Sequence, residues 1–106
     1  MRTLSFIVDG LIINKNPDCD FSDLVPGTTG YLVADFSFSN DWDDTVKVVA
    51  FFNKKGECPP QILKNGHSCM IPEEALIGST FEICVLGKKQ NMKLTTNKIK
   101  VVQNGG

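Results

Sequence analysis

The residues with the most evident capacity for chemistry are the cysteines and the single histidine. Cys58, His67 and Cys69 carry thiol and imidazole groups, which are common zinc ligands, and His67 and Cys69 would share one face of a strand because they lie two residues apart. The four cysteines, which also include Cys19 and Cys84, form no Cys-x-x-Cys pair, whereas zinc sites typically use such close pairs. We therefore expect free thiols and no metal site.

Two groups of carboxylates are the next candidates. Asp18, Asp20 and Asp23 suggest a calcium loop, but their spacing lacks the glycine and the terminal glutamate of an EF-hand. Turn formation is the simpler interpretation, because aspartate is favoured in turns. Glu73 and Glu74 resemble an acid pair, yet spacing places no histidine, serine or further acid beside them.

A catalytic site would need a nucleophile within reach of a base. His67 lies next to a predicted turn, and no serine or cysteine can be placed around it from the sequence. We therefore predict that the protein is not an enzyme and binds no cofactor.

Composition limits the class of protein further. The 106 residues suffice for one domain, with 42% hydrophobic and 22% charged residues, as in ordinary globular proteins. A net charge of −1 argues against nucleic-acid binding, and no segment approaches the ~18 consecutive apolar residues of a membrane span. The apolar run at the N-terminus is too short for a signal peptide, so we expect synthesis in a cytoplasm. Lysines at 88, 89, 93, 98 and 100 are interpreted as solvated strand edges and hairpin tips.

The segment 31–53 is the centre of the predicted fold. Apolar residues alternate along 32–38 and 46–53, which is the pattern of two half-buried strands, and the acidic loop 40–44 between them holds the only tryptophan. An indole there can cap the end of the core. The predicted core markers are Phe36, Phe38, Trp42, Phe52 and Ile83.

Similar reasoning assigns the remaining segments. Leu4, Phe6 and Val8 alternate in a first strand, which Asp9-Gly10 interrupts either as a hairpin turn or as a bulge in one bent strand; we favour the bent strand. Residues 15–29 form a loop fastened by Phe21, Leu24 and Val25. Strands are expected at 68–71 and 80–86, a turn at 87–91, and a last strand at 92–102 with a bend near 96–97. An edge segment is expected at 58–63, a single helical turn at 72–76, and a frayed tail at 103–106.

This pattern predicts an all-β protein. We expect one antiparallel β-sandwich of immunoglobulin-like type over residues 1–106, with about seven or eight short strands and one short helical turn near 72–76.

Three sequence blocks occur in an order that resembles a known domain. They are the Tyr-Leu…Phe-Ser…Asp-Trp block at 31–42, the Cys-x-Ile-Pro-Glu block at 69–73 and the Leu-Thr-Thr-Asn block at 94–97. Over about residues 4–102 the chain resembles the small β-sandwich domain at the N-termini of tail and baseplate proteins, such as baseplate upper proteins, in phages of Gram-positive bacteria. In that family the domain usually anchors a longer host-binding protein, so the present chain is either one piece of such a protein or a stand-alone module.

The resemblance implies a non-enzymatic docking module that binds a tail, baseplate or capsid protein, or a second copy of itself, in the virion. The alternative is a small phage-encoded inhibitor that binds a host defence protein in the cytoplasm of the infected bacterium. The candidate interaction loop is Asp41, Trp42, Asp43 and Asp44, which in the inhibitor could mimic a ligand of a basic channel. For docking in the virion, the edge strands that carry prolines could fit against another subunit. A sugar-binding sandwich is a further alternative, although the chain has only one Trp and one Tyr.

Overall fold

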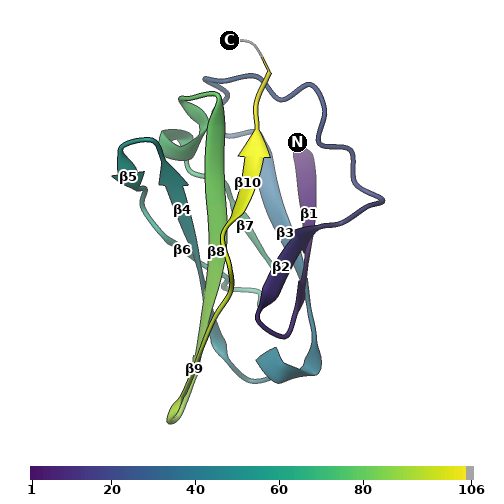
Figure 1. Ribbon diagram of the computed structural model, residues 1–106, viewed down its shortest axis with the longest axis vertical. Helices are drawn as coiled ribbons and strands as arrows, with labels where there is room; N and C mark the ends of the chain where they lie inside the picture. Colours follow the sequence, from purple (N-terminus) through teal and green to yellow (C-terminus); the bar gives the residue numbers. More distant parts are fainter. Residues whose placement is uncertain (105–106) are drawn as a thin grey trace.

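The computed structural model describes residues 1–104, and its regular elements are strands and two short 3-10 turns. The all-β prediction is thus confirmed, and η2 (Glu73–Leu76) lies where the helical turn was expected (Figure 1). None of the helical segments in the described part of the chain has the length and apolar character needed to cross a membrane. The other 3-10 turn is η1 (Asn40–Trp42), and the strands are β1 (Arg2–Asp9), β2 (Ile12–Lys15), β3 (Leu32–Phe38), β4 (Val46–Asn53), β5 (Gly56–Glu57), β6 (Gln61–Ile62), β7 (Ser68–Met70), β8 (Thr80–Lys89), β9 (Met92–Thr95) and β10 (Ile99–Val102).

The strands form two sheets. The four-stranded sheet has the order β2-β1-β3-β7, and the six-stranded sheet has the order β10-β8-β4-β5, with β6 also paired to β4 and β9 also paired to β8. The short strands β5 and β6 therefore pair with different parts of β4, and β9 and β10 with different parts of β8. In Figure 1, β3 and β7 of the four-stranded sheet lie behind β8 and β10.

One strand pair contradicts the antiparallel prediction: β1 and β3 are parallel, in register from Arg2 with Leu32 to Val8 with Phe38. The strand β2 brings the chain back to the end where β1 begins, and the following loop stays at that end. The Arg2 N–H donates to the Tyr31 carbonyl oxygen at 2.9 Å, so β3 starts beside the start of β1. The wholly antiparallel prediction is wrong because β3 pairs with β1 and not with β2. Since β2 reverses the chain, β3 runs in the same direction as β1 and lies beside it.

Asp9-Gly10 belongs to a hairpin turn, so the bent strand that we favoured is also wrong. Asp9 pairs with Ile12, which leaves Gly10 and Leu11 as a two-residue loop. Gly10 has a φ of +59°, a conformation that glycine adopts without steric cost. A hairpin this short is marginal alone, but β3 pairs along the other side of β1 and supports it.

One hydrophobic cluster joins the two sheets, and it contains the alternate residues expected of the first strand. A row of aromatic rings runs through it from Phe21 to Phe6, Phe36, Phe38 and Trp42, with successive centroids 5.4, 5.4, 6.0 and 5.3 Å apart. Trp42 is fully buried, and its Nε1–H donates to the Gly10 carbonyl oxygen at 2.8 Å. The indole therefore closes one end of the core and is tied to the β1–β2 hairpin.

The strand β4 presents to the core the face opposite to the one that the predicted core marker Phe52 implied. Val49 and Phe51 are fully buried, and Phe51 pairs with the buried Ile83 on β8. Phe52 lies on the outer face, half-buried, with the Lys98 ammonium 4.0 Å from its ring centroid. Phe52 is therefore wrong as a core marker, because both faces of β4 are apolar and alternation alone does not distinguish them.

The bend predicted near Thr96-Asn97 is present between β9 and β10, and it ties the two sheets together. The Thr96 hydroxyl accepts the Val85 N–H at 2.9 Å and donates to the Asn97 carbonyl oxygen at 2.8 Å. The Asn97 side chain accepts the Ile13 N–H at 2.8 Å and donates to the Ile13 carbonyl oxygen at 3.4 Å. Because Ile13 lies in β2, Asn97 joins the edge of the four-stranded sheet to the six-stranded sheet.

The loop predicted at 15–29 runs from 16 to 31 and is fastened to the body at several points. Its anchors include Phe21, which packs on Phe6, the buried Leu24, and the Arg2 guanidinium, which donates to the carbonyl oxygens of Asp20 and Ser22. Val25 is 58% exposed, so its predicted anchoring role is wrong.

The tail predicted to fray is held as far as it is described. Gln103 is buried, and its side-chain amide donates to the carbonyl oxygens of Leu76 at 3.1 Å and Gly78 at 2.8 Å. The Asn104 N–H donates to the Leu24 carbonyl oxygen. Fraying at 103 and 104 is therefore wrong, and the prediction for 105 and 106 lies outside the described residues.

Gly87 was expected in a turn, but β8 continues through it to Lys89. A Cβ atom on residue 87 would lie 2.6 Å from Cζ3 and 2.8 Å from Cε3 of Trp42. Only a residue without a side chain lets the indole lie this close to the β8 backbone.

We expect Gly87→Ala to destabilise the protein by about 1–3 kcal/mol, because the added methyl group must displace the indole or the strand. Urea unfolding followed by Trp42 fluorescence measures the change. Gly78→Ala is the matched control, since its Cβ would have only an ordinary contact, 3.9 Å from the Thr80 carbonyl oxygen. Equal unfolding free energies for the two variants would contradict the proposed role of the glycine.

We expect Asn97→Ala to cost about 1 kcal/mol or more, because the Ile13 N–H loses its acceptor between the sheets. Asn91→Ala at the β8–β9 turn is the control, since that side chain makes no hydrogen bond within residues 1–104. Chemical denaturation compares the two, and no difference between them would argue against Asn97 as a link between the sheets.

Candidate protein-interaction surface

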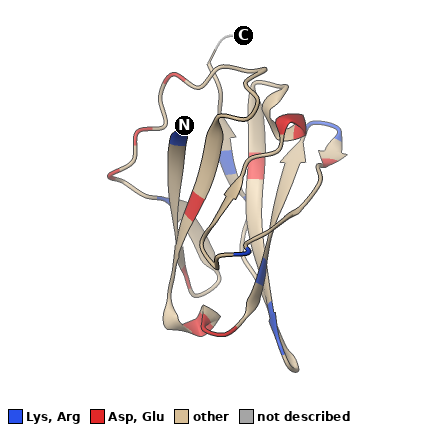
Figure 2. Ribbon diagram, turned by 180° about the vertical axis from the view of Figure 1, so that it is seen from behind, with Lys and Arg blue, Asp and Glu red and all other residues tan. Residues whose placement is uncertain are grey.

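The predicted acidic loop lies at one end of the molecule, where the ribbon of its acidic residues is red in Figure 2. Asp41, Asp43 and Asp44 are exposed, but Trp42 is fully buried and offers no surface to a partner. The Asp44 carboxylate lies 3.7 Å from the Lys89 ammonium on the β8–β9 hairpin. This exposed ion pair contributes little stability, but it places positive charge beside the loop.

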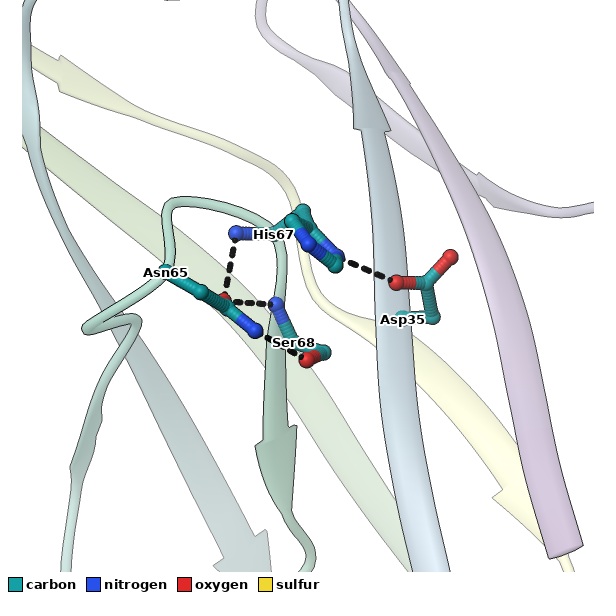
Figure 3. A network of polar contacts seen from close by, with 4 residues as sticks. All are labelled: Asp35, Asn65, His67 and Ser68. Atoms are coloured by element: carbon teal, nitrogen blue, oxygen red, sulfur yellow. Dashed lines mark hydrogen bonds and ion pairs between the residues drawn. The ribbon is translucent and has the colours of Figure 1, made fainter.

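The only histidine forms a polar contact on the outer face of the four-stranded sheet (Figure 3). His67 Nδ1 lies 2.9 Å from Oδ1 of Asp35, with side-chain exposures of 59% and 37%. Asn65 Oδ1 accepts the backbone N–H groups of His67 and Ser68, and Asn65 Nδ2 donates to the Ser68 hydroxyl at 2.7 Å. The amide of Asn65 thus shapes the turn and binds the Ser68 hydroxyl, while the imidazole contacts Asp35.

The candidate metal ligands point in different directions. Cys69 pairs with Ala34 and packs against the core, while His67 contacts Asp35 on the outer face, so the prediction that the two share one face is wrong. Cys58 is buried between β5 and β6. Within residues 1–104, no three His, Cys, Asp or Glu side chains are grouped closely enough to hold a metal ion.

The carboxylates at 18–23 shape a turn. Asp20 Oδ1 accepts the Ser22 hydroxyl at 2.6 Å and the Ser22 N–H at 2.8 Å, and these hydrogen bonds lower the pKa of Asp20. Asp23 adopts a φ of +58°, which aspartate tolerates in turns. Glu73 and Glu74 are exposed in the first turn of η2.

The outer face of the six-stranded sheet carries an apolar surface that the sequence analysis did not identify. Ile62 on β6, Val48 on β4 and Leu86 on β8 lie side by side in the strand register, and Val46 follows at the start of β4. Val46 is 65% exposed and Ile62 is 58% exposed. We call these four residues the apolar patch. The sequence does contain an indication of this patch. Both faces of β4 are apolar, and since only one of them can pack in the core, the other must lie outside it.

A groove lies at the hairpin end of the apolar patch. Its volume is about 500 Å³, and Val46, Val48, Leu86, Lys88 and Lys93 are among the residues that line it. The apolar side chains come from β4 and β8, and the lysines come from the β8–β9 hairpin. The surface thus combines an apolar floor with positive charge at one border, which is suited to contact with a protein.

Comparison with protein-family models, with curated proteins and with solved structures finds no match for this chain.

Cys69 provides a pH-dependent test of the packing of β7. Burial raises the pKa of its thiol from the ordinary 9.0 to about 12. We expect alkylation by iodoacetamide near pH 8 to be about a thousandfold slower in the folded than in the unfolded chain, because the thiolate is the reactive form. The folded rate should keep rising toward pH 12, while the unfolded rate levels off near 9.

The raised pKa of Cys69 also makes the free energy of unfolding depend on pH. The folded state holds the Cys69 proton more tightly, so this contribution to stability is complete below pH 9 and is lost as the pH rises toward 12.

Peptide-resolved mass spectrometry measures the alkylation rates, with urea-unfolded protein as the control. Folded and unfolded rates within about tenfold of each other near pH 8 would contradict the burial of the thiol.

Proposed function

We propose that this chain is a non-enzymatic docking module of a phage particle, an immunoglobulin-like β-sandwich that binds a tail, baseplate or capsid protein. The observation that carries the docking role is the apolar patch beside the lysines of the β8–β9 hairpin. The phage setting is supported by the order of the three sequence blocks at 31–42, 69–73 and 94–97.

The chemistry of the patch favours a particular kind of partner. Burial of the exposed Val46 and Ile62 side chains against a partner would stabilise the complex by about 25 cal/mol per Å² of apolar area removed from water. Lys88 and Lys93 border the same surface and favour carboxylates on the partner. The expected partner is therefore a protein whose contact surface is apolar at its centre and acidic at its border.

A second candidate function is inhibition of a host defence protein. It is favoured by the exposure of Asp41, Asp43 and Asp44 at one end of the molecule, where they could occupy a basic channel. This function would use the acidic loop, whereas virion docking would use the apolar patch, so variants of the two surfaces separate the proposals.

Mass spectrometry of purified particles tests the docking role. We expect the wild-type chain in the particles and an Ile62→Asp variant to be reduced by about tenfold or more, because a charge then sits inside the contact. The matched control is Ile12→Asp, which changes a similarly exposed isoleucine, at 53%, on the other sheet.

Other outcomes decide against docking. Absence of the wild-type chain from particles, or equal incorporation of Ile62→Asp and the control, would overturn it.

A triple change of Asp41, Asp43 and Asp44 to Asn tests the second candidate function and should leave incorporation into particles unchanged. Loss of binding to a host protein in that triple variant alone would instead support the inhibitor.

A further inference from the structure

The groove lies where β8 and β9 extend past the start of β4. Val46 pairs with Lys88, and this is the last pair between β4 and β8 at that end. The hairpin continues beyond it through Lys89 and Met92 (Figure 1). The projecting hairpin therefore forms one wall of the groove, and the side chains of Val46, Val48 and Leu86 form its apolar floor.

Two lysines stand together on this wall. Lys88 and Lys93 are directly opposite each other in the β8–β9 register, so their side chains share one face. Like charges in this arrangement destabilise a hairpin. Both side chains are exposed, and in the part of the chain that the structure describes neither forms an ion pair. An anion bound at the mouth of the groove would relieve this repulsion.

The charges around the groove are unequally distributed. The nearest ion pair, Asp44 with Lys89, engages a different lysine. Further along the outer face, Lys98 covers Phe52, and Glu82 lies opposite Lys100. Uncompensated positive charge is therefore concentrated at Lys88 and Lys93, immediately beside the apolar floor.

We infer that the groove receives a segment of the partner protein in which a bulky apolar side chain lies next to carboxylates. The apolar side chain rests on Val46, Val48 and Leu86, and the carboxylates pair with Lys88 and Lys93. A volume of about 500 Å³ falls within the ~300–1,000 Å³ of ligand pockets and has room for such a side chain. This inference rests on the proposed docking function and specifies its contact.

Short peptides test the inference with the whole chain. The probes are three acetylated and amidated peptides, GEFEG, GKFKG and GESEG, titrated into ¹⁵N-labelled protein. We expect GEFEG to shift the amide resonances of Val46, Leu86 and Lys88. GKFKG and GESEG should each bind at least about tenfold more weakly than GEFEG. GKFKG loses the charge match with the lysines, and GESEG loses the apolar contact.

Charge reversal makes the test specific. A Lys88→Glu, Lys93→Glu variant should weaken binding of GEFEG by about tenfold and bind GKFKG in its place. A Lys54→Glu, Lys55→Glu variant is the control, because it makes the same two changes at exposed lysines in the turn between β4 and β5, away from the groove. Since Lys88 and Lys93 are exposed, the reversal should leave the protein folded, which the ¹⁵N spectrum itself reports.

The inference is overturned if GEFEG does not bind, if the three peptides bind equally, or if the shifts map away from the groove. It is also overturned if decanoate binds there more tightly than GEFEG, since the ligand would then be a fatty-acid anion. If the peptides fail but Ile62→Asp is still lost from particles, only the groove inference falls. Absence of the chain from particles removes the docking proposal itself.

Discussion

The contact between the Trp42 indole and the backbone at Gly87 holds together parts of the fold that are far apart in sequence. The indole nitrogen donates to the Gly10 carbonyl oxygen in the β1–β2 hairpin, the ring packs at a tilt against Phe38 of β3, and its edge lies against the β8 backbone. One side chain therefore connects both sheets at the end where the core would otherwise open to water. Asn97 makes a second connection between the sheets through hydrogen bonds to Ile13 of the same hairpin.

The molecule presents different chemistry on its two outer faces. The four-stranded sheet is mainly polar there, and its most organised feature is the contact between His67 and Asp35. The six-stranded sheet exposes the apolar patch and its bordering lysines. The four-stranded sheet also exposes Ile7 and Ile12, but its polar groups are hydrogen-bonded around Asp35 and His67. The contiguous apolar area on the six-stranded sheet is the reason why we propose that face for docking.

Much of the fold follows from alternation in the sequence, but the parts that depend on neighbours do not. The segments that became β1, β3, β4 and β8 have period-two patterns, and the Thr96-Asn97 bend was signalled by a change of apolar face. The inward face of β4 was assigned incorrectly because Val48 and Val49 are equally apolar, and only the pairing of Phe51 with Ile83 decides between them. The same error concealed the apolar patch. Gly87 was taken for a turn because nothing local reveals that Trp42, far away in sequence, lies against it.

The parallel pairing of β1 with β3 also has a practical consequence. Arg2, the start of β3 and the end of β10 lie at one end of the molecule, while η1 and the β8–β9 hairpin lie at the other (Figure 1). A fluorescent protein or an affinity tag fused before Met1 would thus be attached on the side remote from the groove. Immobilisation through such a fusion would leave the β8–β9 hairpin exposed to solution and accessible to a binding partner.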